Sequence, residues 1–133
     1  MEFFKDFIFD EAKHTVNIVW NNNETLFNAS DIGHILNIRN MHQATYVFTK
    51  EQKRFIFREG YNGEQQDTLF LTERGVCRIT CSSGTCKAWE LQEWMRDEVD
   101  RLDYFDGILH RLEKGWTLKV HNKTYPITNV QKS

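Results

Sequence analysis

A run of basic and amide side chains between residues 39 and 58 is the part of this sequence best suited to binding an anionic ligand. Arg and Lys neutralise phosphates and release their counterions, while Asn, Gln and Arg can form paired hydrogen bonds with base edges. The pattern therefore predicts nucleic-acid binding mainly by phosphate contacts, with limited base readout. The candidate DNA-binding residues are Arg39, Asn40, His42, Gln43, Lys50, Lys53, Arg54 and Arg58, extended by Lys119 and Lys123 near the C-terminus.

We call residues 39–58 the 39–58 segment. Aromatic side chains lie within this segment and just after it. Tyr46 and Tyr61 are suited to stacking on exposed bases, a contact that tolerates any base sequence. Phe55 can stack in the same way, but we expect it in the core. Both double-stranded and single-stranded DNA therefore remain open as the ligand.

Catalytic and metal-binding patterns are weaker. Cys77, Cys81 and Cys86 have the spacings C-x3-C and C-x4-C, whereas structural zinc sites use four ligands in paired short spacings, so free thiols are favoured. The five histidines form no H-E-x-x-H pairing, and the sequence contains neither a phosphate-binding glycine loop nor a G-x-S-x-G motif. We therefore predict no catalytic residue, no metal site and no cofactor.

The distribution of charge along the sequence limits which ligands the protein can attract. The 133-residue chain has a formal charge of −2, so it is not a polycation. The 39–58 segment holds five bases and one acid, residues 111–133 also hold five bases and one acid, and residues 90–110 hold two bases and seven acids. A nearly neutral protein of this kind can still present one cationic face. Residues 90–106 form the opposite feature, an acidic helix.

The sequence shows no sign of a membrane or secretory protein. No apolar run reaches the ~18 residues that span a bilayer, and the start of the chain lacks the pattern of a signal peptide. Three cysteines without a secretion signal favour reduced thiols. We expect an intracellular protein without a membrane partner.

Period-two patterns predict the strands. Aromatic and alternating apolar residues place strands within residues 3–20, followed by a turn at 21–23 and a further strand at 26–27. Two more strands are expected at 53–57 and 67–71, on either side of a loop with two glycines. These short strands indicate small antiparallel sheets.

Helical spacing predicts a helical hairpin and a long helix. Asn28 is the expected N-cap of the first helix, with Asp31 in its first turn, and a break at 37–40 precedes a second short helix. The inward residues of that second helix are expected to be Ala44, Val47 and Phe48. Thr72 is the expected N-cap of a third helix, whose predicted inward residues are Val76, Ile79 and Cys77.

The long helix is predicted over 86–102, with Ala88, Leu91, Trp94, Met95, Val99 and Leu102 along its core-facing stripe. Residues 103–114 continue it or form another helix, and 117–120 and 123–125 flank a hairpin turn at 121–122. The fold class is therefore α+β, with small antiparallel sheets packed against a helical hairpin and a long C-terminal amphipathic helix, plus a terminal β-hairpin. Residues 1–103 form the expected domain. Residues 104–133 form an appendage that belongs to the same compact unit or acts in dimerisation.

Three blocks of the sequence together resemble the N-terminal domain of the BRO family of large DNA viruses and phages. The first block runs from Leu26 to Ile32 and continues through Ile35-Leu36, Arg39-Asn40 and Ala44. The second is the turn Leu71-Thr72-Glu73-Arg74-Gly75-Val76, and the third is the helix with Ser83, Ala88, Leu91, Trp94-Met95 and Glu98-Val99. The resemblance spans residues 15–102.

The chain departs from the family pattern in a few places. Asn37 stands where the family often has Gly, and Met41 stands where Pro is common. Asp100-Arg101 replaces the usual Leu-Pro, so the long helix is free to run on.

The resemblance implies a DNA-binding regulatory domain without catalysis or a required cofactor, located in the host nucleus or cytoplasm for a eukaryotic virus and in the cytoplasm for a phage. The alternative hypothesis is an antirepressor-like protein-interaction module that sequesters a host or viral regulator through the acidic helix 90–106. A homodimer is a further hypothesis, because exposed strand edges pair readily.

Overall fold

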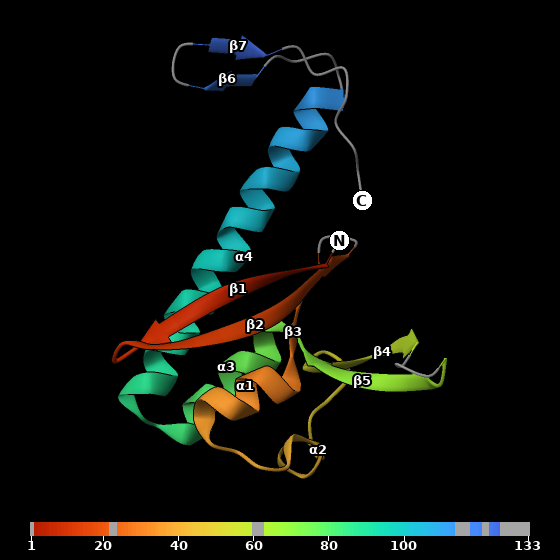
Figure 1. Cartoon of the computed structure of the whole chain (residues 1–133), viewed down its shortest axis with the longest axis vertical. Coiled ribbons are helices and arrows are strands. Elements are labelled where there is room, and N and C mark those ends of the chain that lie inside the picture. The colour runs from red at the N-terminus through yellow and green to blue at the C-terminus, as the bar shows by residue number, and fades with distance from the viewer. Residues whose placement is uncertain (1, 22–23, 60–62, 114–117, 121–122, 126–133) are drawn as a thin grey trace.

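The computed structural model describes residues 2–21, 24–59, 63–113, 118–120 and 123–125 (Figure 1). In chain order, its elements are β1 (Glu2–Phe9), β2 (Ala12–Asn21), β3 (Glu24–Asn28), α1 (Ala29–Leu36), α2 (Met41–Ala44), β4 (Lys53–Glu59), β5 (Gln65–Leu71), α3 (Glu73–Ser83), α4 (Cys86–Glu113), β6 (Leu118–Val120) and β7 (Lys123–Tyr125). The predicted α+β class is confirmed, as are the long helix and the terminal hairpin of β6 and β7. No helix in this described part of the chain is both long and apolar enough to cross a membrane.

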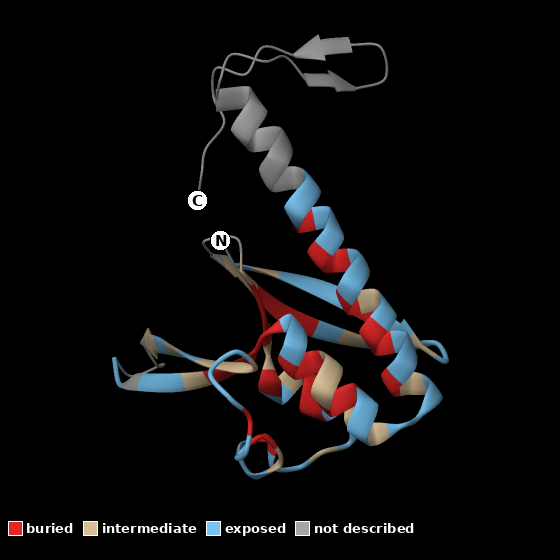
Figure 2. Ribbon diagram, turned by 180° about the vertical axis from the view of Figure 1, so that it is seen from behind, coloured by how far each residue is buried: buried red, intermediate tan, exposed pale blue. Residues whose placement is uncertain are grey.

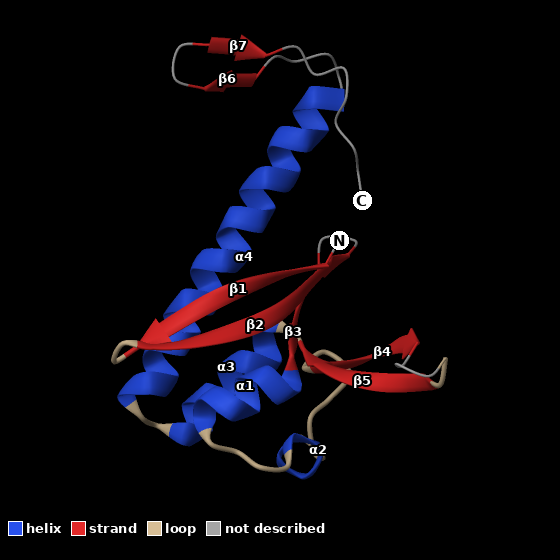
Figure 3. Ribbon diagram, viewed as in Figure 1, coloured by secondary structure: helices blue, strands red, loops and turns tan. Residues whose placement is uncertain are grey.

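An open antiparallel sheet of five strands, in the order β1-β2-β3-β5-β4, forms the centre of the fold. Strand β3 pairs with β5 only at Phe27↔Leu71 and Asn28↔Phe70, whereas β1–β2 and β4–β5 are long hairpins. Figure 3 shows the helices α1, α3 and α4 against the β1–β2 side, while the far end of the β4–β5 hairpin projects away from them. The short β3–β5 seam therefore joins two hairpins that diverge.

The predicted caps begin the helices as expected. The Asn28 side chain accepts a hydrogen bond from Asp31 N at 3.2 Å, and Thr72 Oγ1 accepts one from Gly75 N at 3.2 Å. Helix α1 ends at Asn37, which has the left-handed φ of 60°. Asn tolerates that conformation better than most side chains, so it can end the helix here without a glycine.

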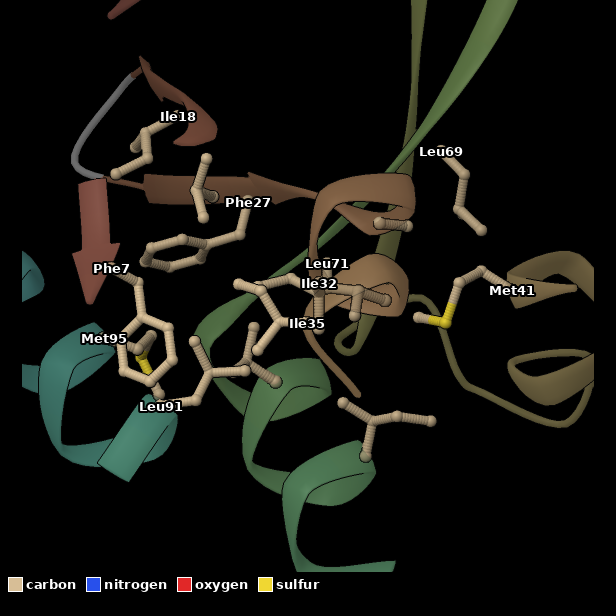
Figure 4. Packing of buried hydrophobic residues seen from close by; sticks show 14 of the residues in the cluster. Phe7, Ile18, Phe27, Ile32, Ile35, Met41, Leu69, Leu71, Leu91 and Met95 are labelled. Carbon is tan, nitrogen blue, oxygen red and sulfur yellow. The ribbon is translucent and has the colours of Figure 1, made fainter. Parts of the chain in front are cut away.

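The core lies between the sheet and the helices (Figure 4). Leu91 and Met95 of α4 pack with Phe7 of β1, Phe27 of β3 and Ile32 of α1 in one buried cluster. Figure 2 shows the buried stripe along the described part of α4, which confirms the predicted core-facing residues. Trp94 is half-buried, and its ring lies edge-on to those of Phe7 and Phe27.

Two predictions about the 39–58 segment are wrong. Helix α2 ends at Ala44, and Val47 is 67% exposed. Beyond the helix, the carbonyl of Thr45 accepts hydrogen bonds from Phe48 N at 2.9 Å and from the Lys53 ammonium at 3.0 Å, so the end of the turn is satisfied without a further helical turn. Phe55 is 54% exposed, because it lies on β4, at the edge of the sheet, where no further element covers it within the described residues.

The structure explains why a glycine occupies position 75 in the turn Leu71–Val76. Its Cα faces the backbone carbonyl of Gln52, and a Cβ at this position would overlap that oxygen. The same carbonyl accepts a hydrogen bond from Thr72 N at 3.1 Å, so it cannot move without breaking the start of α3. Only glycine therefore allows α3 to pack against the loop before β4.

We predict that Gly75→Ala destabilises the protein by about 1–3 kcal/mol, the usual cost of overpacking a rigid contact. Thermal unfolding followed by circular dichroism measures the change. The control is Arg74→Ala, an exposed substitution one residue earlier in the same helical turn. Equal melting temperatures for the two variants would contradict the prediction.

His14 of β2 is a half-buried titratable group. Its ring stacks on Phe7 with centroids 6.3 Å apart, and Nε2 is buried without a hydrogen-bond partner among the described residues. Burial first, and then the positive charge of Lys87, lower the pKa of His14 below its ordinary value. The folded state therefore favours the neutral ring.

We predict that the protein loses stability as the pH falls below about 6.5, the pKa of His14 in the unfolded chain, because the unfolded state then binds the proton more readily. Between about pH 7 and about pH 5, the free energy of unfolding of the His14→Phe variant should decrease less than that of wild type. Urea denaturation at both pH values gives the comparison. His34→Phe, at an exposed site, is the control, and an unchanged acid sensitivity in His14→Phe would refute the assignment.

Candidate nucleic-acid interface

Strand β4 divides the cations of the 39–58 segment between two faces of the sheet. Side chains alternate between the faces of a strand, so six residues of β4 separate into two sets. The set that faces α2 is Lys53, Phe55 and Phe57, and the opposite set is Arg54, Ile56 and Arg58. The structure therefore does not bring all the predicted cations to one surface.

The two arginines of β4 both have acidic partners. Arg58 binds the Glu2 carboxylate at 2.9 Å and Asn17 Oδ1 at 3.1 Å, and its guanidinium lies 5.0 Å from the centroid of the Phe70 ring. Arg54 binds Glu24 at 3.0 Å. Arg58 thus links the first strand of the sheet to the last, and DNA would have to compete with these carboxylates for either side chain.

A polar cleft of about 750 Å³ brings other predicted residues together. It lies between α1, the connection 37–40, the start of α2 and β5. Arg39, Asn40 and His42 line it, and Arg39 is exposed. The cleft therefore brings together Asn40 and His42, two of the three residues predicted to read bases, while Gln43 lies outside its lining.

His34 and Asp67 also line this cleft, although the sequence analysis did not single them out. His34 lies three residues after Asp31 on α1, and its position between Ile32 and Ile35, which face the core, was an available signal that its side chain points outward. Asp67 had no such signal, because only the pairing of β5 within the sheet brings it to α1. Its negative charge limits how close a phosphate can come to that wall of the cleft.

The amide and imidazole side chains of α2 are differently engaged. Asn40 Oδ1 accepts a hydrogen bond from Gln43 N at 3.1 Å and so caps the helix, which leaves its amide N–H groups for other contacts. His42 stacks on Phe55 with ring centroids 6.3 Å apart and planes at 25°. The Gln43 side chain is exposed.

Exposed aromatic rings lie next to the cleft. Phe55 and Phe57 are 54% and 62% exposed, and Tyr46 after α2 is 81% exposed. The Lys53 ammonium lies 5.9 Å from the centroid of the Phe55 ring. We call Phe55, Phe57, Tyr46 and His42 the aromatic face. Phe57 was missed in the sequence because its alternation with Arg58 looks like an ordinary half-buried strand.

The remaining predicted cations differ in how free they are. Lys53 is half-buried and its ammonium binds the carbonyls of Thr45 and Tyr46, whereas Lys50 is exposed. Next to Lys50, a hydrogen bond from the Thr49 side chain is the main cause that lowers the pKa of Glu51, so this carboxylate offsets part of the positive charge.

Some predicted contacts lie outside the described residues. These are Tyr61, the turn at 121–122, and the side chains of Lys119 and Lys123, whose backbones belong to β6 and β7.

The three cysteines are free thiols, and only Cys77 is half-buried. Within the described residues, no three His, Cys, Asp or Glu side chains gather as metal ligands would.

Comparison with known families identifies the chain. Residues 15–101 match the BRO family, N-terminal domain, so most of the chain is covered and the protein belongs to this family. Domains of this family are of the DNA-binding regulatory type, occur in viral and phage proteins, and are not typically enzymes. Searches of curated proteins and of solved structures found no match.

The ion pairs of β4 lead to a prediction about stability. Arg58→Gln should lower the free energy of unfolding by about 1–2 kcal/mol, because the buried Asn17 oxygen and the Glu2 carboxylate lose their shared donor. Arg39→Gln, at an exposed position in the cleft, should leave it unchanged. Chemical denaturation of both variants measures the difference. If the two variants are equally stable, Arg58 does not hold the sheet together.

Proposed function

We propose that this protein is a DNA-binding regulatory domain that uses the cleft and the aromatic face as its contact surface. Arg39 and Lys50 neutralise phosphates, with Lys53 adding positive charge near the Phe55 ring. Asn40, His42 and Gln43 give limited base readout. The observation that carries the proposal is the meeting of Arg39, Asn40 and His42 in one cleft.

The chemistry of this surface supports the proposal. The guanidinium of Arg39 can donate to phosphate or to a guanine edge, and the free amide N–H groups of Asn40 can donate to base acceptors. The exposed rings of Phe55 and Tyr46 offer faces on which unpaired bases can stack. Arg54 and Arg58 contribute to long-range attraction, and direct contact requires their ion pairs to open. We propose that Lys119 and Lys123 extend the same cationic surface.

The wider assignment follows from the same proposal. We propose an intracellular regulatory role without catalysis or a cofactor, in the host nucleus or cytoplasm for a eukaryotic virus and in the cytoplasm for a phage. Residues 1–103 act as the binding domain, and 104–133 act as its appendage, within the same unit or as a dimerisation element.

Salt dependence tests the DNA-binding proposal. The logarithm of the affinity for a labelled duplex should fall linearly with the logarithm of the salt concentration. The double variant Arg39→Gln, Lys50→Gln should reduce the magnitude of that slope by about 2, one unit for each lost phosphate contact. Fluorescence anisotropy at several salt concentrations measures it, with a single strand of the same sequence in parallel.

The matched control is Lys87→Gln, Arg96→Gln, which removes the same charge from α4. Its slope should remain that of wild type. The proposed surface is wrong if both double variants change the slope equally, or if neither does.

A second candidate function is an antirepressor-like interaction with a regulatory protein. The observation that favours it is the row of exposed acids Glu90, Glu93 and Asp97 on α4. Glu98 is excluded from this row, because it is buried and bound to Arg101 at 3.3 Å. An exposed acidic row can repel DNA and attract a basic protein surface.

A further inference from the structure

Strand β1 leaves one edge of the sheet open. It is the terminal strand, and its partner among the described strands is β2 alone. Strand β4, which carries part of the proposed DNA surface, is at the opposite edge. Phe4 and Ile8 of β1 are 66% and 63% exposed, although both are apolar. A long edge with exposed apolar side chains is a template on which another strand can pair.

The register of the hairpin shows which backbone groups are free on that edge. Asp10 and Glu11, both with left-handed φ, form a two-residue turn, so the flanking pair Phe9↔Ala12 is hydrogen-bonded. Bonded and non-bonded pairs alternate along an antiparallel ladder. The N–H and C=O groups of Phe4, Asp6 and Ile8 therefore point away from β2 and are available to an added strand.

A groove of about 460 Å³ runs beside this edge, between β1 and α4. Its apolar lining comes from Ile8 and from the rings of Phe7 and Trp94, which meet edge to face with centroids 5.8 Å apart. Figure 1 shows α4 crossing behind the β1–β2 hairpin, so the helix forms the second wall. An added strand would point every second side chain into this groove.

The same groove has acidic walls. Asp6 lies on the strand side, and Glu90, Glu93 and Asp97 lie on the helix side. The three helix acids recur at three- and four-residue steps and so share one face of α4. Lys13 is 3.6 Å from Asp6, but within the described residues no ion pair engages the three helix acids. Their charge complements a cationic ligand.

We propose that the β1 edge and this groove bind an extended segment of another protein in which Lys or Arg alternates with apolar residues. Its backbone pairs with the free groups of Phe4, Asp6 and Ile8. Because its side chains alternate between the two faces of the sheet, its cations lie on the α4 side, beside Glu90, Glu93 and Asp97. Its apolar side chains lie on the opposite face, next to Phe4 and Ile8. The inference goes beyond DNA binding, because it uses the opposite edge of the sheet, and it gives the acidic-helix alternative a defined partner chemistry.

The test uses the whole chain and a synthetic peptide of about eight alternating Val and Lys residues, matched in length to β1. Nuclear magnetic resonance should show slower amide exchange at Phe4, Asp6 and Ile8 when the peptide binds. A peptide of the same length with Pro in place of one of the two inner Val residues should lose this protection, because Pro cannot donate to the ladder. An alternating Val and Glu peptide should not bind.

Charge variants test the acidic wall. The triple variant Glu90→Gln, Glu93→Gln, Asp97→Asn should raise the Kd for the Val and Lys peptide by about fivefold, because it removes three exposed and individually weak ion pairs. The matched control is Glu73→Gln, Asp100→Asn, Asp103→Asn, which has the same net charge and exposed positions outside the groove. Its Kd should stay within about twofold of wild type.

Several results would overturn the proposal. These are no peptide binding at millimolar concentration, protection of amides other than those of the β1 edge, equal affinity of the two triple variants, or equal binding of the Val and Glu peptide. Protection of the β1 amides that rises with protein concentration alone would instead assign the edge to a second copy of this chain. The double variant Arg39→Gln, Lys50→Gln should bind the peptide with the affinity of wild type, so the outcome is independent of the DNA-binding proposal.

Discussion

The two residue pairs that join β3 to β5 hold the whole sheet together. Phe27 and Leu71 of this seam are fully buried, and their side chains belong to the same core as α1 and α4. The seam is short because α1 begins at Ala29, directly after β3 ends. The strand donor left open on β2 is satisfied by the helix instead, since Asn17 N donates to Asp31 Oδ2 at 2.9 Å. Asp31, in the first turn of α1, thus takes the place of a strand acceptor for this backbone N–H of the sheet.

Because only two residue pairs join β3 to β5, the β1–β2 and β4–β5 hairpins diverge and have different surroundings. The β1–β2 hairpin is covered by α4, whose exposed surface is acidic, and the β4–β5 hairpin carries the aromatic face beside a polar cleft. Glu2 and Arg58 connect the two hairpins across the sheet, with the buried Phe70 ring beneath the guanidinium. The exposed acids Glu90, Glu93 and Asp97 of α4 therefore lie beside the β1–β2 hairpin, and the cleft with Arg39 lies beside the β4–β5 hairpin.

Local patterns predicted most of the elements, because the signals that start and stop helices act within a few residues. Asn28 and Thr72 cap the helices as expected, and the apolar stripe of α4 faces the core. The errors arose where a distant group decided the outcome. Val47 lies beyond the end of α2, where Phe48 N and the Lys53 ammonium bind the Thr45 carbonyl, and Phe55 is exposed because the sheet ends at β4.

The sequence by itself determined the α+β class, the family and the presence of a cationic segment, since these depend on residue types and short spacings. Only the tertiary structure decided which of those cations are free. Arg58 is engaged because the sheet brings Glu2 and Asn17 to it from the other end of the domain, and Arg39 is exposed because its loop opens onto the cleft. Ion pairing depends on distances of a few ångströms between residues far apart in the chain, and no local pattern encodes those distances.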